Sequence, residues 1–208
     1  MLAVSGKPFN SAEWVFEPKI DGTRCLADVT SSGVRLHNRR LFEITYRYPE
    51  ITAALGQGAS GCVLDGEVAV FVDGKPSFAA LAERDHQSEK MRIDYLARAV
   101  PTSYVVFDIL YAKEKSIMDL PLRERKQILR EELQESESVS IADSFPEKGE
   151  ESRQELATRA TFLPEACNKD AAYRDCLLSD NTGSPGRGRA AYRSCPRSTP
   201  FAPVRHQN

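Results

Sequence analysis

Apolar and polar residues follow the pattern of β-strands along several short runs before Pro146. Alternation, or a short continuous apolar run, is typical of strands with one or two buried faces. The runs of this kind are residues 14–17, 24–29, 34–38 and 102–111. Residues 62–72 form a further β-type run, although Gly66 interrupts it. Asp73-Gly74 then predicts a hairpin turn, because this pair readily adopts the positive φ angles that such turns need.

Helical patterns lie between and after these runs. Residues 77–99 are mostly compatible with helix, and a second helix is predicted over 120–135, where Pro121 suits the first turn. This second segment has an apolar stripe made of Leu122, Ile128, Leu129 and Leu133. We interpret its charged residues Arg123, Arg125 and Lys126 as the solvated face. Strands and helices together predict one compact α+β unit that ends near residue 146.

The pattern changes after Pro146. Residues 147–160 are charged and compatible with helix, whereas 161–208 show no sustained period of two or of 3.6. Glycine, proline, serine and arginine are scattered through this last segment, which is typical of irregular or disordered chain. We therefore predict a folded domain over 1–160 and a disordered tail over 161–208.

Composition narrows the class of protein. The 208 residues carry a formal net charge of −2 and are 41% hydrophobic, which is compatible with a packed core. No run of about 18 apolar residues predicts a membrane span, and the first residues do not resemble a secretory signal. The 5 cysteines form no CxxC pair, which argues against a disulfide framework. These features favour a cytoplasmic protein.

The candidate chemistry lies in EPKIDGTR, residues 17–24, which sets charged side chains around a glycine between two strand-like runs. Burial and a neighbouring cation such as Arg24 would make the ammonium of Lys19 easier to deprotonate. Gly22 would let the backbone approach a phosphate closely, and Arg24 can bind phosphate through two N–H groups. The pattern indicates attack of Lys19 on a nucleoside triphosphate. Solvent-facing charges beside a turn are the competing interpretation of these residues alone.

KIDGTR resembles motif I, KxDGxR, of the nucleotidyltransferase superfamily, which contains ATP-dependent DNA ligases, RNA ligases and mRNA-capping enzymes. LHNRRLFEITYRYPEI resembles the next ligase block, and VLDGEVAVF resembles motif III. YVVFDILY and LPLRERKQIL resemble motif IIIa and the helix after it. The resemblance runs to about residue 145 and is greatest to the ligase domain of bacterial and archaeal end-joining enzymes. It implies a nucleotidyltransferase fold, the adenylation domain, with antiparallel sheets and flanking helices.

The resemblance also implies roles for residues that would bind ATP. Lys19 would be the catalytic nucleophile that becomes adenylated. Glu17 would form a hydrogen bond with the adenine edge. Arg24 would contact the ribose or the phosphates, and Arg39 would lie near the sugar and the triphosphate. For Arg39 a plain surface charge is the alternative.

Further roles fall on the later strands. Glu67 would bind the ribose or help to hold Mg²⁺, and simple strand alternation that points it to solvent is the alternative. Phe107 would stack on the adenine, as an aromatic residue at the end of a buried strand can, and it could equally be a core residue. Asp108 would support the site without touching the ligand.

The implied function is that of an ATP-dependent DNA ligase with ATP and Mg²⁺ as cofactors. Lys19 would take AMP from ATP, pass it to a DNA 5′-phosphate and so allow a nick to be sealed in repair and recombination. The partner would be nicked or broken double-stranded DNA at the nucleoid, and the protein would be a monomer. Two alternatives stay open. One is a catalytically dead remnant or a module that binds nucleotide or DNA, and the other is an RNA ligase or capping guanylyltransferase.

Parts of the family pattern have no counterpart in this sequence. Motif IV combines Glu-Gly with apolar residues and a lysine, motif V is Lys-apolar-Lys, and an OB-fold domain normally follows. Glu165, within LPEACNK, stands near the expected place of motif IV, but no glycine follows it. The family pattern stops near residue 150. A truncated gene or a shifted reading frame would produce such a change.

The hypothesis of a shifted reading frame can be tested on the nucleotide sequence. One of the other two frames of the nucleotide sequence downstream of codon 150 should encode an EGxxxK block. Translation of all three frames tests this expectation, and the hypothesis fails if none of them contains the block.

Overall fold

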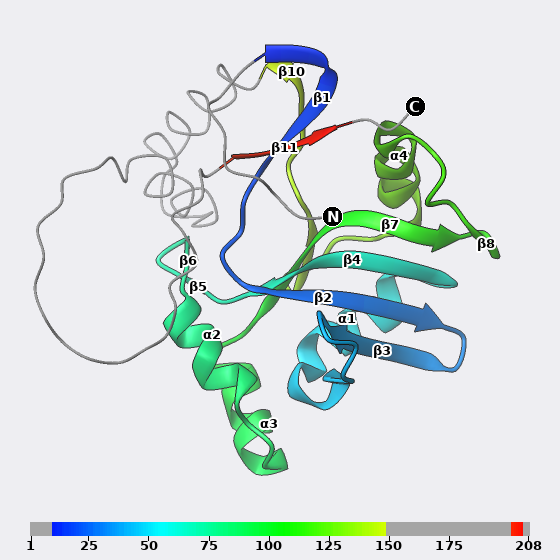
Figure 1. Cartoon of the computed structure of the whole chain (residues 1–208). Coiled ribbons are helices and arrows are strands. Elements are labelled where there is room, and N and C mark those ends of the chain that lie inside the picture. Colours follow the sequence, from blue (N-terminus) through cyan, green and yellow to red (C-terminus); the bar gives the residue numbers. More distant parts are fainter. Residues whose placement is uncertain (1–9, 149–200, 206–208) are drawn as a thin grey trace, which may run out of the picture. The chain divides into compact units, whose positions relative to one another are not determined.

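The computed structural model describes residues 10–148 and 201–205 (Figure 1). The chain divides into two compact units. Of the described residues, the larger unit contains 20–72, 76–143 and Arg205, and the smaller unit contains 10–19, 73–75, 144–148 and 201–204.

The smaller unit contains a sheet with the strand order β10–β1–β11. Its strands are β1 (Asn10–Pro18), β10 (Phe145–Lys148) and β11 (Phe201–Arg205). β1 and β10 are antiparallel, with Phe16 opposite Phe145. Val15 and Phe16 are buried, as the apolar run 14–17 predicts. The strand ends at Pro18, so Lys19 follows it directly.

The larger unit is built on a six-stranded sheet with the order β3–β2–β4–β7–β8 (Figure 1). The sixth strand, β9, pairs with β7. The strands are β2 (Thr23–Thr30), β3 (Gly33–Asn38), β4 (Cys62–Ala69), β7 (Ser103–Ala112), β8 (Lys115–Ser116) and β9 (Val139–Ile141). Every pairing is antiparallel except that of β9 with β7. Two further short strands are β5 (Phe71–Val72) and β6 (Lys75–Pro76). Asp73 and Gly74 between them have φ angles of 50° and 73°, as the predicted hairpin turn requires.

Helices of this unit connect the strands. They are the 3-10 turn η1 (Thr45–Arg47), α1 (Pro49–Gly58), α2 (Phe78–Asp85), α3 (Lys90–Ala99) and α4 (Leu122–Glu132). Pro49 starts α1 at a position where a missing N–H does no harm. The hydroxyl of Ser77 accepts a hydrogen bond from the amide of Ala80 and so caps α2. None of the helices in the described ranges has the length and apolar character to cross a membrane.

One face of the sheet forms the core. Cys25, Ala27, Leu64, Val106 and Ile109 are buried on this face, where they pack with apolar residues of α1 and α4. Because side chains alternate along a strand, the residues between them point to the opposite face. That opposite face is polar at its centre and contains three of the six candidate site residues, Arg24, Glu67 and Phe107.

Tyr104 lies across the gap that Gly66 leaves in β4. A Cβ atom at position 66 would lie 2.6 Å from Cε2 of Tyr104 and 2.6 Å from the carbonyl oxygen of Val105. The tyrosine hydroxyl donates to the carbonyl oxygens of Cys25, at 2.9 Å, and Leu64, at 3.2 Å. Burial raises the pKa of Tyr104 well above its usual value, so the hydroxyl remains a donor. Gly66, which interrupts the apolar run, thus leaves the space that the Tyr104 ring occupies.

The segment ITYRYPEI, which resembles a ligase block, has a structural role here. The Arg84 guanidinium is buried, and its Nη2 lies 2.6 Å from Oε1 of Glu50. The same carboxylate oxygen accepts hydrogen bonds from the amide and hydroxyl of Thr102, at 3.1 and 2.7 Å. Arg47 in turn pairs with Asp85 at 2.9 Å. These contacts join α1 and η1 to α2 and to the start of β7.

Some expectations need correction. Glu147 and Lys148 belong to β10 and not to a helix, and residues 149–160 lie outside the described part. Helix α1 and strand β9 were not among the predicted elements. In the segment predicted to be a disordered tail, residues 201–205 form β11, and the rest of that prediction lies outside the described residues.

Replacement of Gly66 by alanine should destabilise the larger unit. The added methyl group would overlap Tyr104 and the β7 backbone, and overpacking of this kind typically costs about 1–3 kcal/mol. Urea denaturation of the Gly66→Ala variant checks the change in the free energy of unfolding. Gly56→Ala on α1 is the matched control, because its Cβ would meet only Val34 at 3.9 Å. The control should be stabilised by about 0.5–1 kcal/mol, and equal effects of both changes would contradict the packing argument.

Candidate functional site

The polar face of the larger unit is centred on a bulge in β7. Asp65 of β4 lies opposite Asp108, whereas the next residue, Gly66, lies opposite Val106. Phe107 is therefore an extra residue on β7. A bulge shifts the alternation of side chains, so that Asp108 faces the same side as Asp65.

Arg24 connects β2 to this bulge. It lies opposite Glu67 in the β2–β4 ladder, but its guanidinium pairs with Asp65, the diagonal neighbour. Nε lies 3.0 Å from Oδ1 of Asp65 and Nη2 lies 2.5 Å from Oδ2. The guanidinium carbon lies 5.8 Å from the centroid of the Phe107 ring, within reach of a cation–π interaction. The hydrogen bond to Asp65 raises the pKa of Arg24 most, and the charges of Glu67 and Asp108 act in the same direction.

Helix α4 holds the bulge from the other side. Nε and Nη2 of Arg125 each lie 2.9 Å from a carboxylate oxygen of Asp108. Nζ of Lys126 donates to the carbonyl oxygen of Phe107 at 2.8 Å, and this lysine is only 3% exposed. The interpretation of both residues as a solvated helix face was therefore wrong, whereas Arg123 is exposed as predicted. Asp108 forms an ion pair with Arg125, and its expected role in supporting a ligand site stays a prediction.

Gly22 is required by the fold itself. A Cβ atom at this position would lie 2.2 Å from the carbonyl oxygen of Val68 and 2.9 Å from Cγ of Glu67. The chain entering β2 thus passes directly against β4, beside the half-buried Glu67. This close packing explains the glycine of KIDGTR without a phosphate.

Arg24, Glu67 and Phe107 are brought together on one face by β2, β4 and β7. Arg39 is exposed on the loop after β3, and Asn38 before it pairs with Cys25, so this loop begins at the end of the sheet where Arg24 lies. Glu17 and Lys19 belong to the smaller unit. Glu17 is buried near the end of β1, and Lys19 is half-buried just after it.

Carboxylates near the bulge limit how a metal could bind. In the described residues, no three His, Cys, Asp or Glu side chains come together as a metal site. Asp65 and Asp108 already pair with arginines. Mg²⁺ beside a nucleotide usually takes one or two carboxylates together with phosphate oxygens and water. Glu67, as a single carboxylate, fits that smaller requirement.

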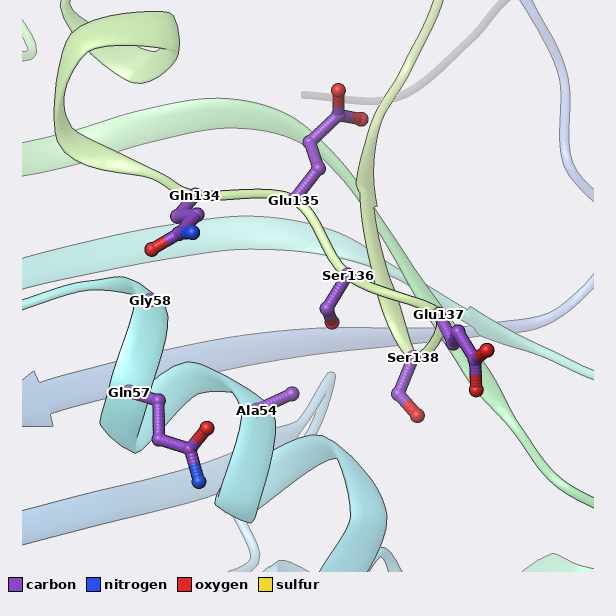
Figure 2. A pocket seen from close by; sticks show the side chains of 8 residues that line it. All are labelled: Ala54, Gln57, Gly58, Gln134, Glu135, Ser136, Glu137 and Ser138. Carbon is purple, nitrogen blue, oxygen red and sulfur yellow. The ribbon is translucent and has the colours of Figure 1, made fainter.

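A separate surface hollow lies between α1 and the segment that leads from α4 to β9 (Figure 2). Its volume is about 320 Å³, and it is lined by Ala54, Gln57, Gly58, Gln134, Glu135, Ser136, Glu137 and Ser138. The side chain of Glu135 points away from α1, and its Oε1 accepts the Ile141 amide at 2.7 Å. No predicted site residue lines this hollow. Since α1 packs on the core face of the sheet, the hollow is not part of the polar face.

Comparison with known families decides the kind of protein. Residues 1–161 match the family described as the ATP dependent DNA ligase domain. The chain belongs to the ATP-dependent DNA ligase family. It is thus an ATP-binding nucleotidyltransferase domain by family, and the resemblance of KIDGTR and of the later blocks is confirmed.

Curated relatives of this ligase-family chain are longer proteins. It is 36% identical over 135 residues to the probable DNA ligase of Koribacter versatilis (strain Ellin345). This aligned region covers 62% of this chain and 23% of that protein. The chain is 32% identical over 155 residues to the DNA ligase of Thermococcus fumicolans, covering 73% and 27%. For the SPbeta prophage-derived DNA ligase-like protein LigB of Bacillus subtilis (strain 168), the identity is 35% over 124 residues, covering 59% and 42%. The match spans less than half the length of each relative.

Solved ligases share the fold. The mycobacterial DNA ligase D complexed with ATP and MES superposes with a TM-score of 0.58 and 23% identity, over 74% of this chain and 48% of that chain. The ligase domain of LigD from M. tuberculosis gives a TM-score of 0.57 at 23% identity, over 74% and 47%. The predicted α+β adenylation-domain fold is confirmed.

Removal of one partner from the ion pair between α4 and the bulge should destabilise the larger unit. Replacement of Arg125 by methionine would leave the Asp108 carboxylate buried without this partner, which typically costs about 3 kcal/mol. Arg123→Met removes the same charge from the exposed side of α4 and should change stability by no more than about 0.5 kcal/mol. Urea denaturation of both variants measures the difference. Equal stabilities of the two variants would show that the Arg125–Asp108 ion pair does not hold the fold.

Proposed function

We propose that the chain is the adenylation domain of an ATP-dependent DNA ligase, over residues 1–160, and that Lys19 is its nucleophile. The observation that carries the proposal is the gathering of Arg24, Glu67 and Phe107 around the β7 bulge. β2, the strand of Arg24, begins at Thr23, four residues after Lys19 of KIDGTR. A chain of three residues spans at most about 11 Å, so covalent connection alone keeps Lys19 near Gly22.

The proposed reaction is nucleotidyl transfer to an amine. The unprotonated Nζ of Lys19 attacks the α-phosphorus of ATP, the new N–P bond forms, and the bond to pyrophosphate breaks. As the N–P bond forms, the nitrogen releases one of its two protons to water, which leaves a phosphoramidate. Lys19 is half-buried and follows directly after β1.

The polar face supplies groups suited to the nucleotide. Phe107 is half-buried on its bulge and would stack on adenine. Glu17, which belongs to the smaller unit, would form the hydrogen bond with the base edge that the family resemblance implies. Arg24 is fixed by Asp65, so its guanidinium is already oriented for ribose or phosphate oxygens. Arg39, on the loop at the same end of the sheet, would contact the sugar or the triphosphate.

Glu67 would hold Mg²⁺ together with the phosphate oxygens, or bind the ribose. The ion would neutralise part of the triphosphate charge. Gly22 brings the chain entering β2 against Glu67, which places this carboxylate beside the KIDGTR turn.

The later steps are proposed for the ligase of which this domain is a part. AMP would pass from Lys19 to the 5′-phosphate at a nick or break in double-stranded DNA inside the cell. The adjacent 3′-hydroxyl would then attack that phosphate, and AMP would leave as the strand is sealed. Support for these steps comes from family membership and from relatives that are described as DNA ligases.

Self-adenylation tests the proposal. The purified chain is incubated with α-labelled ATP and Mg²⁺ and then run on a denaturing gel beside Lys19→Ala. Label should remain on the wild type and be absent from Lys19→Ala, because an N–P bond survives denaturation and alanine has no nucleophile. Lys90→Ala, which removes an exposed lysine on α3, is the matched control and should be labelled like the wild type.

Two results would contradict the proposal. A wild-type chain that unfolds cooperatively yet takes no label would favour a module that binds without chemistry. Label from GTP in preference to ATP would favour a capping-type transferase.

A further inference from the structure

The loop after β3 presents two large apolar side chains to solvent. Leu41 is 68% exposed and Phe42 is 64% exposed. Single exposed apolar residues are ordinary on a protein surface. These two are adjacent at the tip of a loop, and two exposed arginines, Arg39 and Arg40, come directly before them.

Hydrogen bonds hold this tip in one conformation. Oδ1 of Asn38 accepts the amides of Arg40 and Phe42, at 2.9 and 3.1 Å. The backbone of Asn38 also exchanges hydrogen bonds with Leu41, at 2.8 Å, and with Phe42, at 3.0 Å. Leu41 has a φ of 61°, which is unfavourable for a residue with a branched side chain. The loop therefore holds its apolar side chains outward in an ordered, unfavourable conformation.

The chemistry of the tip matches duplex DNA. Arginine guanidinium groups bind phosphate oxygens, and apolar wedges such as leucine and phenylalanine pack between base steps or against sugars. The loop contains two arginines and one acid, Glu43, so its charge complements a polyanion. Opening a base step is easiest where stacking is already interrupted, as at a strand break.

The position of the loop agrees with this chemistry. Asn38 pairs with Cys25 at the end of the β2–β3 ladder, next to Arg24. The tip thus lies at the end of the sheet to which the nucleotide is assigned above.

We propose that Leu41 and Phe42 form an apolar wedge that packs on DNA at the strand break, with Arg40 on a neighbouring phosphate. This inference rests on the proposed function, because it takes broken duplex DNA as the substrate. It assigns to the loop a contact with DNA that is separate from the contact of Arg39 with the nucleotide.

The test uses the full chain and a nicked duplex with 2-aminopurine next to the nick. Fluorescence anisotropy gives the affinity, and 2-aminopurine brightness reports unstacking of the base. Wild type should bind and brighten the probe. Leu41→Ala/Phe42→Ala should lose about 5- to 100-fold in affinity, the range expected for an aromatic contact with bases, and should not brighten the probe.

A matched control removes similar apolar surface elsewhere. Met91 and Tyr95 on α3 are 77% and 60% exposed, and Met91→Ala/Tyr95→Ala should bind and brighten like the wild type. Arg40→Gln should weaken binding and reduce the dependence of affinity on salt.

Several outcomes would overturn the inference. One is a loop variant that binds nicked DNA and brightens the probe like the wild type, and another is a control that loses as much affinity as the loop variant. A wild type that shows no binding at roughly 100 µM, where even non-specific DNA binding is measurable, also overturns it. So does self-association that Leu41→Ala/Phe42→Ala removes without any change in DNA binding. Labelling of Lys19 is measured on the same preparations, so a failure of adenylation is seen separately from a failure of the wedge.

Discussion

The packing of the Tyr104 ring over Gly66 is the contact on which the sheet of the larger unit depends. Its hydroxyl satisfies two carbonyl groups on the core side of β2 and β4, and the glycine gives its ring the space to do so. With that side chain in place, Asp65 and Glu67 on either side of Gly66 both face the opposite side of the sheet. The position of the buried Tyr104 ring on one face thus goes together with the position of the Asp65 and Glu67 carboxylates on the other face.

The carboxylates make the polar face a balanced electrostatic structure. Asp65 pairs with Arg24 and Asp108 pairs with Arg125, so two ion pairs flank Phe107. Charges that are already oriented need little reorganisation when a reaction changes the charge distribution. Burial of such pairs is costly to folding, and their presence around a half-exposed aromatic residue is consistent with a site rather than with a structural core.

Much of this arrangement could be predicted from the sequence, but not all. Alternation predicted the strands that became β2, β3 and β7, and Pro121 with its apolar stripe predicted α4. The motif order placed Arg24, Glu67 and Phe107 on strands, although their adjacency depends on the pairing of β2 with β4 and of β4 with β7. The bulge at Phe107 cannot be predicted from the sequence of β7 alone, because it is a shift in the register of β7 against β4.

The roles of Arg125 and Lys126 were missed for the same reason. A helical stripe shows which residues are apolar, but it does not show that a lysine beside the stripe can reach a carbonyl of the neighbouring strand. The sequence does contain a signal for helix α1, because Pro49 is followed by Ile51 and Leu55, which lie one turn apart. The same residues belong to a ligase-like block, and this resemblance conceals the helical pattern.

The bond from Lys126 to the Phe107 carbonyl has a consequence for how this protein can change. The course of β7 at the bulge is held through the backbone of residue 107 and through Asp108, so it does not depend on which side chain position 107 carries. A different residue can therefore replace the phenylalanine while the strand keeps its path. If Phe107 stacks on the base as proposed, a change in the preferred base would need one altered codon and no rebuilding of the sheet.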